Sequence, residues 1–307
     1  MKDKLIVIAG PTAAGKTALS VELAKKINGS VISADSMQVY KYMDIGSAKI
    51  SREEMDGIPH YLVDVLEPSD EFNISVFKKM ADDAIADIRA SGRTPIVAGG
   101  TGFYIRALAY DTEFTEEEHK EDVRGELEKI LAEKGNEYLH DMLREIDPES
   151  AEAIHPNNTK RVIRAIEYFR LNGSRISEHN KASREKESPY DLSYFVLDMD
   201  RERLYQRIDL RVDLMMQAGL LDEVKRLKAM GYDRSFVSMQ GLGYKELLDY
   251  LDGFTTLEEA VDIIKRDTRH FAKRQLTWFR SEKDAVFLSA EEYSTTEEQV
   301  EFILNHI

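Results

Sequence analysis

The sequence predicts an α/β fold: a P-loop parallel sheet flanked by helices, with an all-helical insertion domain. Three observations support this prediction. Residues 1–115 alternate short apolar runs with amphipathic stretches, residues 116–190 show helical periodicity without strand patterns, and strand patterns return at Tyr194. Alternating strands and helices favour a parallel sheet covered by helices. We therefore expect one domain built from residues 1–115 and 191–307, and a second domain inserted at residues 116–190.

The first part of the chain contains four predicted strands and three predicted helices. The strands are expected at Leu5–Ala9, Ser30–Ala34, Tyr61–Val65 and Thr94–Ala98. The helices are expected at Ala18–Ile27, from a cap at Ser75 to Arg89, and at Phe103–Ala109. In the second of these helices, helical spacing places Val76, Met80, Ala84 and Ile88 on the buried face.

The remaining elements follow from the same patterns. In the insertion, Leu127, Leu131, Leu139 and Leu143 fit amphipathic helices, and a further helix, Arg161–Leu171, ends at Asn172-Gly173. The later elements are a strand at Tyr194–Asp198, a helix from a cap at Asp200 to about Met216, a basic helix at Glu258–Phe279, a strand at Val286–Leu288 and a helix at Glu297–Ile307.

Composition excludes several classes of protein. The chain of 307 residues has no cysteine, so a disulfide framework and a zinc site built on thiolates are excluded. Its seven histidines lack metal-ligand spacing, and no apolar run is long enough to span a membrane. The N-terminus leads directly into the first strand, which argues against a signal peptide. We expect a cytoplasmic monomer with no membrane partner.

The net charge of −15 argues against a nucleic-acid partner, but the charge is unevenly distributed. Residues 157–186 and 265–283 are rich in Lys and Arg, whereas residues 116–126 are strongly acidic. Local fields, and not the total charge, determine where a polyanion docks.

The strongest motif is a phosphate-binding loop between the first strand and the first helix. It consists of Gly10, Pro11, Thr12, Ala13, Ala14, Gly15, Lys16 and Thr17. Glycines let backbone N–H groups turn around an oxyanion, and the start of the helix adds its positive dipole end. Lys16 adds a movable charge, and the Thr17 hydroxyl is placed to ligate Mg²⁺. We therefore expect a diphosphate or polyphosphate ligand with Mg²⁺ as cofactor. The loop also occurs in ATP-binding proteins, and the sequence leaves open whether a nucleotide binds as well.

Polar residues at two other strand ends should face the same crevice, because ligands of parallel sheets bind beyond the carboxyl ends of the strands. Asp35 follows the second strand, and Thr101 follows Gly99-Gly100 after another. Asp35 could hold Mg²⁺ in an NTPase, take a proton in a transferase, or merely cap a turn. Thr101 could present a hydroxyl to an oxyanion or belong to a simple connecting turn.

A row of arginines occupies one face of the helix after Asp200. Arg203, Arg207 and Arg211 recur at helical spacing, so they form either a solvated face or a diphosphate clamp. A GTPase is disfavoured because Asn180-Lys181-Ala182-Ser183 lacks the carboxylate of the guanine motif. A motor ATPase is disfavoured because no apolar run ending in Asp-Glu follows the loop.

The chain resembles the tRNA dimethylallyltransferases, also called tRNA isopentenyltransferases, nearly from end to end. The segments that carry the resemblance are GPTAAGKT at Gly10–Thr17, DSMQVY at Asp35–Tyr40, MDIGSAK at Met43–Lys49, PHYLVD at Pro59–Asp64, GGTGFY at Gly99–Tyr104, Asp147-Pro148 with Ile154–Pro156, KRVIRAIE at Lys160–Glu167 and KRQLTWFR at Lys273–Arg280. The departures are small: Ser47 stands where the family usually has Thr, Ile50 where it usually has Pro, and Tyr61 where His or Arg is common.

The resemblance implies transfer of the dimethylallyl group from dimethylallyl diphosphate to N6 of the adenosine on the 3′ side of the anticodon. Asp35 would then be the general base. Lys16, Thr101 and Arg211 would contact the leaving diphosphate, and Thr17 the Mg²⁺ ion. The target adenine must be extruded from its stack to reach the base, at a cost of a few kcal/mol.

The implied partner is the anticodon stem-loop of tRNA, held by the insertion and the basic helix. The residues expected to bind it are Asp35, Ser36, Met37, Gln38, Thr101, Arg124, Lys160, Arg161, Arg164, Arg269, Lys273 and Arg274. Three other interpretations stay open: a P-loop kinase of small molecules, a prenyltransferase of free adenine nucleotides, and an RNA-binding protein with a vestigial loop. A kinase of small molecules would leave the basic insertion unexplained, and a prenyltransferase of free nucleotides would not need that insertion. An RNA-binding protein with a vestigial loop would tolerate loss of Lys16, which is present.

Overall fold

The computed structural model describes residues 2–112 and 123–307, and these residues form two compact units. Unit 1 comprises Met1–Asp111 and Ser188–Ile307, and unit 2 comprises Thr112–Glu187. The boundaries of unit 2 differ by four residues or fewer from those expected for the insertion, residues 116–190. The expected start of the insertion, up to residue 122, lies outside the described residues.

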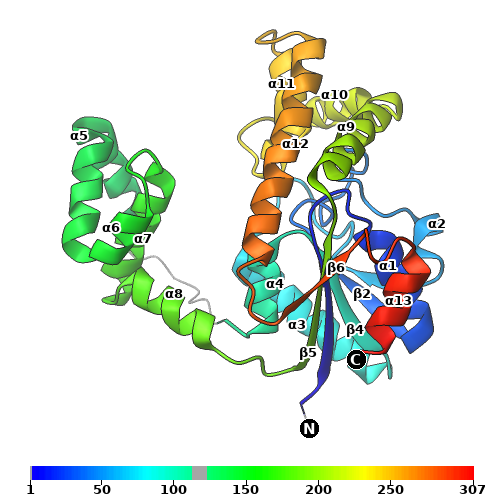
Figure 1. Cartoon of the computed structure of the whole chain (residues 1–307). Coiled ribbons are helices and arrows are strands. Elements are labelled where there is room, and N and C mark those ends of the chain that lie inside the picture. Colours follow the sequence, from blue (N-terminus) through cyan, green and yellow to red (C-terminus); the bar gives the residue numbers. More distant parts are fainter. Residues whose placement is uncertain (1, 113–122) are drawn as a thin grey trace. The chain divides into compact units, whose positions relative to one another are not determined.

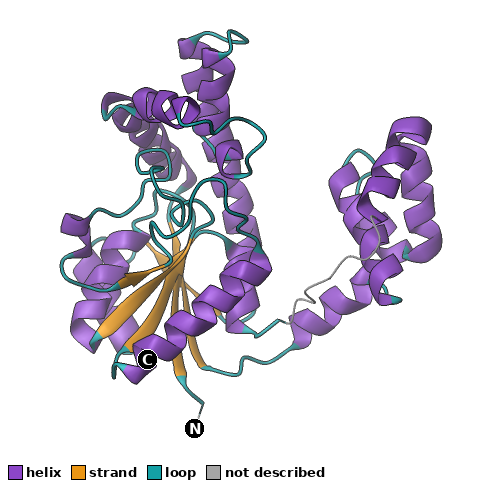
Figure 2. Cartoon of the chain, turned by 180° about the vertical axis from the view of Figure 1, so that it is seen from behind, coloured by secondary structure: helices purple, strands orange, loops and turns teal. Residues whose placement is uncertain are grey.

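Unit 1 contains a six-stranded parallel sheet of order β3-β2-β4-β1-β5-β6 (Figures 1 and 2). The strands are β1 (Lys4–Ala9), β2 (Gly29–Ala34), β3 (His60–Tyr61), β4 (Thr94–Gly99), β5 (Asp191–Asp198) and β6 (Ala285–Ser289). The chain passes from β1 to strands on one side of it and later to strands on the other, so the strand order reverses there. A crevice forms at such a point beyond the carboxyl ends of the strands.

Helices cover both faces of this sheet. On one face lie α1 (Lys16–Ile27) and α13 (Thr296–Leu304), and on the other lie α3 (Ile74–Ala90) and α4 (Gly102–Ala109). The short helix α2 (Arg52–Met55) packs against α1. Beyond the carboxyl ends of the strands stand α9 (Arg201–Gln217), α10 (Leu220–Ala229), α11 (Tyr244–Leu251) and most of α12 (Leu257–Phe279), with a short 3₁₀ turn at Ser238–Gln240 (Figure 1). Alternate residues of β1 serve two separate cores: Val7 packs with α3 and α4, whereas Ile8 packs with α1 and α13. Burial on both faces explains why β1 is a continuous apolar run.

Unit 2 is entirely helical among its described residues. Its helices are α5 (Val123–Ile146), α6 (Pro148–Ala153), α7 (Thr159–Asn172) and α8 (Ile176–Glu185). Leu127, Leu139 and Leu143 are fully buried in its core, as the periodicity predicts, whereas Leu131 is only half-buried against that core. The helix α7 ends at Gly173, whose φ of 68° lies in the left-handed region that favours glycine.

Three sequence predictions need correction. The strand expected at Tyr61–Val65 is reduced to His60–Tyr61, because Leu62 and Asp64 have φ near +60° and break the extended run. The helix expected from a cap at Ser75 is instead capped by Asn73, whose side chain accepts the N–H groups of Ser75 and Val76. Its buried face includes Phe77 and Ala81, whereas Val76 and Met80 are only half-buried.

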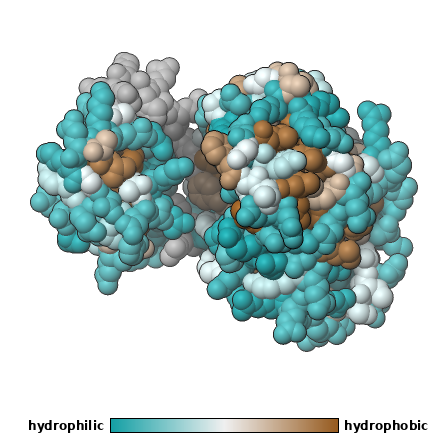
Figure 3. All heavy atoms as spheres, turned by 90° about the horizontal axis from the view of Figure 1, so that it is seen from above, coloured by the Kyte–Doolittle hydropathy of each residue, from teal (hydrophilic) through white to brown (hydrophobic). Residues whose placement is uncertain are grey.

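No helix among the described residues is long and apolar enough to cross a membrane. Hydrophilic side chains predominate on the face of the molecule in Figure 3, and apolar side chains gather in patches between them.

Candidate active site

The phosphate-loop motif connects β1 to α1 and turns sharply through residues of positive φ. Gly10, Ala13 and Gly15 have φ of 146°, 65° and 105°. Gly10 also packs closely against β5, because a Cβ on it would lie 2.8 Å from the carbonyl oxygen of Leu197. Gly15 is the N-cap of α1 and supplies no capping side chain, so the first N–H groups of α1 are left for a ligand.

One pocket of unit 1 joins this loop to the ends of β2 and β4 and to α9. From the motif, Thr12, Ala13, Gly15, Lys16 and Thr17 line the pocket, whereas Pro11 and Ala14 are buried. Asp35, Gln38, Gly99, Gly100, Arg207 and Arg211 line the same pocket. The residues that follow β1, β2 and β4 therefore line one pocket, as the sequence predicts.

Lys16 lies half-buried among these groups. Its ammonium donates a hydrogen bond to the carbonyl oxygen of Pro11 at 2.7 Å. Burial lowers the pKa of Lys16 to about 8, the carboxylate of Asp35 partly offsets that shift, and the guanidinium of Arg211 adds to it. Lys16 is thus a cation whose charge depends on pH near neutrality.

Asp35 both caps a turn and faces the pocket. Its Oδ1 accepts the backbone N–H of Met37 at 2.9 Å, which is the capping role that the sequence left open. Its side chain also lines the pocket with Lys16. The backbone N–H of Ser36 donates to Oγ1 of Thr101 at 3.3 Å, so this turn is bonded to the start of α4. Ser36, Met37 and Thr101 lie next to the pocket residues and are not part of the described lining.

The arginine row of α9 divides between the pocket and solvent. Arg207 and Arg211 line the pocket, and Nε of Arg207 donates to the carbonyl oxygen of Ala13 at 2.9 Å. Arg203 is exposed and is absent from the described lining. Two of the three arginines are therefore placed for an anion at the phosphate-loop motif, which favours the clamp over the solvated face.

Sequence reasoning assigned no role to Gln275, which joins two walls of the pocket. The side chain is buried, its Oε1 accepts the N–H of Thr12 at 2.9 Å, and its Nε2 donates to the carbonyl oxygen of Gly100 at 2.9 Å. A Cβ on Gly100 would lie 2.2 Å from that Nε2, so any larger residue here would displace the amide of Gln275. The only signal in the sequence was its place within Lys273–Arg280.

Other lining residues were also not predicted as pocket residues: Ser20, Val31, Ser33, Ser47, Ile50, His60, Ala98 and Phe271. His60 bonds through Nδ1 to the carbonyl oxygen of Ile58 at 2.9 Å. Burial lowers the pKa of His60, and the hydrogen bond to that carbonyl partly offsets the shift.

With this geometry in place, comparison with known proteins identifies the family. The sequence profile of the IPP transferase family matches residues 38–282. The chain belongs to the IPP transferase family. A tRNA dimethylallyltransferase from Lachnoclostridium phytofermentans is 59% identical over 291 residues, which cover 95% of this chain and 93% of that protein.

Solved structures of the IPP transferase family agree with this assignment. The full-length tRNA isopentenylpyrophosphate transferase from Bacillus halodurans is 46% identical, with a TM-score of 0.74 over 99% of this chain and 96% of that one. A eukaryotic dimethylallyltransferase acting on tRNA is 32% identical, with a TM-score of 0.83 over 99% of this chain and 80% of that one. The parallel sheet flanked by helices, expected from the sequence, is confirmed.

The basic residues expected to bind tRNA lie in both units of the chain. In unit 2, Lys160, Arg161 and Arg164 are exposed at the start of α7, and Arg124 lies on α5. Arg124 and Arg164 approach the carboxylate of Glu167 at 3.9 and 3.3 Å. These two guanidinium groups are therefore already partly neutralised within unit 2.

In unit 1, the three expected basic residues of α12 differ in their surroundings. Lys273 and Arg274 are exposed. Arg269 is instead paired with the carboxylate of Asp209 on α9. Of the three, Lys273 and Arg274 are thus the better placed to contact an external phosphate.

Proposed function

We propose that this protein transfers the dimethylallyl group of dimethylallyl diphosphate to N6 of the adenosine on the 3′ side of the anticodon in tRNA. The observation that carries the proposal is a single pocket in which a phosphate-loop motif, two arginines and a carboxylate meet. The chain's 59% identity to a tRNA dimethylallyltransferase supports this choice over other reactions at such a loop.

The pocket residues suit the charge changes of this reaction. As the bond between C1 of the allyl group and the diphosphate oxygen breaks, the diphosphate leaves with the electron pair. Lys16, Arg211 and the N–H groups at the start of α1 would stabilise that negative charge. The new bond joins C1 to N6 of the adenine, and the carboxylate of Asp35 would accept the proton that N6 loses.

Mg²⁺ is part of the proposal, and Thr17 is the protein group that would hold it. Thr17 is exposed, lines the pocket and stands in the first turn of α1. Among the described residues, no group of three or more His, Cys, Asp or Glu could hold a metal. Mg²⁺ commonly binds through one or two protein oxygens and the phosphates of a substrate, so a single hydroxyl fits this ion. Bound there, Mg²⁺ would neutralise charge on the diphosphate.

The acceptor residues belong to the same proposal. Gln38 lines the pocket beside Asp35, and Ser36 and Met37 are in the same turn, where an extruded adenine would enter. The basic residues of α7 and α12 would hold the phosphates of the anticodon stem-loop. The cytoplasmic location and the monomeric state expected from the sequence stay predictions.

The test is a transfer assay with labelled dimethylallyl diphosphate, Mg²⁺ and bulk tRNA, followed by nuclease digestion and mass spectrometry of the nucleosides. We expect label on the N6-dimethylallyl derivative of adenosine. Parallel reactions replace tRNA with AMP, or replace the donor with ATP and a set of small metabolites. Label on AMP alone would support a prenyltransferase of free nucleotides, and consumption of ATP without RNA would support a kinase.

A further inference from the structure

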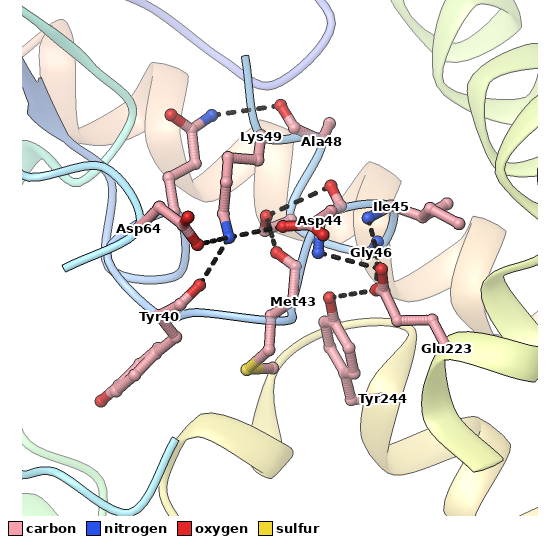
Figure 4. Close-up of polar contacts among 12 residues, drawn as sticks. Tyr40, Met43, Asp44, Ile45, Gly46, Ala48, Lys49, Asp64, Glu223 and Tyr244 are labelled. Carbon is pink, nitrogen blue, oxygen red and sulfur yellow. Dashed lines mark hydrogen bonds and ion pairs between the residues drawn. The ribbon is translucent and has the colours of Figure 1, made fainter. Parts of the chain in front are cut away.

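A buried carboxylate outside the pocket, that of Glu223 on α10, binds three consecutive backbone N–H groups. Its Oε2 accepts from Asp44 at 2.9 Å and from Ile45 at 2.8 Å. Its Oε1 accepts from the N–H of Gly46 at 3.1 Å and from the hydroxyl of Tyr244 at 2.8 Å (Figure 4). Glu223 is only 2% exposed, so these four donors replace its hydration.

The turn at residues 44–46 is shaped to receive this carboxylate and the tyrosine beside it. A Cβ on Gly46 would lie 2.5 Å from Cζ of Tyr244, so only glycine allows the ring to approach. Burial raises the pKa of Tyr244, and the neighbouring carboxylate of Glu223 raises it further. The phenol therefore stays protonated and donates to Glu223.

The segment that Glu223 holds continues directly into the pocket wall. Ser47 and Ile50 line the pocket. Between them, the carbonyl oxygen of Ala48 accepts a hydrogen bond from Nε2 of Gln38 at 3.2 Å, and Oε1 of Gln38 accepts from the hydroxyl of Ser33 at 3.2 Å. With both ends of its amide bonded, Gln38 presents a fixed edge to the pocket.

A lysine holds the same segment from its other side. The ammonium of Lys49 bonds to the carbonyl oxygen of Tyr40 at 2.7 Å and to the carboxylates of Asp44 and Asp64 at 2.6 and 2.8 Å (Figure 4). The side chain of Lys49 is only 7% exposed. The segment of residues 43–49 is therefore bonded to α10 through Glu223, and to Tyr40 and Asp64 through Lys49.

We propose that Glu223 is a positioning residue for the acceptor: it fixes the turn at residues 44–46 and, through Ala48, the amide of Gln38 beside Asp35. The inference rests on the proposed function. The phosphate-loop motif is fastened separately, by Arg207 and Gln275, so donor binding should not depend on Glu223.

Glutamine cannot replace Glu223 in this role. A carboxylate only accepts hydrogen bonds, whereas an amide has one accepting oxygen and an NH₂ group that donates. In E223Q the NH₂ group would face backbone N–H groups, and at least one of them would lose its partner. Y244F removes one donor and leaves the three backbone bonds, so it should have a smaller effect.

The experiment compares wild type, E223Q and Y244F in three measurements. These are amide hydrogen exchange in residues 43–50, equilibrium binding of an unreactive thiolo analogue of dimethylallyl diphosphate, and kcat/KM for tRNA at saturating donor. In E223Q we expect exchange to accelerate at least tenfold and kcat/KM for tRNA to fall at least tenfold. Donor affinity should stay within about twofold of wild type. In Y244F we expect smaller increases in exchange and smaller losses of kcat/KM for tRNA, again with donor affinity unchanged.

D147N is the matched control, because Asp147 is a buried carboxylate in unit 2 that also accepts four hydrogen bonds, from the N–H and hydroxyl groups of Ser150 and Ser177. It should lose stability without faster exchange in residues 43–50. Unchanged exchange in E223Q, or a parallel loss of donor affinity and tRNA use, would overturn the positioning role. Failure of wild type to modify tRNA would instead overturn the proposed function, while the exchange measurement would still test whether Glu223 holds the turn.

Discussion

At the scale of single residues, Asp35 has two roles, one in its own turn and one in the pocket. Different substitutions remove one role or both. One oxygen of Asp35 holds its own turn through Met37, and the carboxylate faces the pocket. Asp35→Asn keeps an oxygen for the turn but cannot accept a proton, whereas Asp35→Ala loses both. We expect either variant to lower kcat by about 10²–10⁴, the usual value of a general base, with little change in tRNA affinity. Single-turnover rates and filter binding measure the two effects, and near-normal turnover in Asp35→Asn would contradict the role of base.

Lys16 gives a prediction about pH. Its pKa of about 8, lowered mainly by burial, means that the free protein loses this positive charge as the pH rises through 8. Donor affinity should therefore fall above that pH, because the charge-assisted contact to the diphosphate is lost. Calorimetric titration of the unreactive donor analogue between pH 6.5 and 9.5 measures this. In Lys16→Arg the fall in donor affinity at high pH should disappear, since arginine stays protonated over that range.

The pH dependence of donor affinity also tests the interaction between Lys16 and Asp35. The carboxylate raises the pKa of Lys16, so removing it in Asp35→Ala should move the fall in donor affinity to lower pH. An unshifted profile in that variant would show that the two groups do not interact.

At the scale of elements, periodicity predicted the strands and helices that form the core. The strands β1, β2 and β4 and the helices α1 and α9 were predicted within two residues of their observed bounds, because each carries one strong apolar pattern. Residues 218–256 received no prediction, although they contain α10 and α11. The contact between α10 and the turn at residues 44–46 could not be predicted either. Glu223 and its partners Asp44–Gly46 are distant in sequence, and only the folded chain brings them together.

The contact between α12 and the turn after β4 gives a prediction for these elements. Gly100→Ala should destabilise the protein by about 1–3 kcal/mol, because the added Cβ would collide with the buried amide of Gln275. Gln275→Ala should also destabilise it, since the N–H of Thr12 and the carbonyl oxygen of Gly100 lose their partner. Urea unfolding of both variants and of the double variant measures the coupling. The cost of Gly100→Ala should shrink when Gln275 is absent, and additive costs would contradict the contact.

At the scale of the whole molecule, an acidic protein must hold a polyanion. The net charge of −15 opposes tRNA binding at long range, so binding must depend on local positive groups. The structure separates the basic residues by their partners, which the sequence could not do. Arg269 is paired with Asp209, and Arg124 and Arg164 approach Glu167. Within the described part of the chain, Lys160 and Arg161 are exposed and have no carboxylate within ion-pair distance.

Reversing the charge of this pair should weaken tRNA binding broadly across tRNA species, since phosphate contacts position RNA without reading its sequence. In K160E/R161E the slope of log K against log salt should flatten by roughly 0.7–0.9 for each lost phosphate contact. K129E/K134E is the matched control, because it makes the same charge change on exposed residues of α5 in the same unit. Affinity measured over a salt series for several tRNAs, with donor affinity alongside, distinguishes the two. An unchanged slope in K160E/R161E, or an equal change in the control, would mean that tRNA phosphates dock elsewhere than at the start of α7.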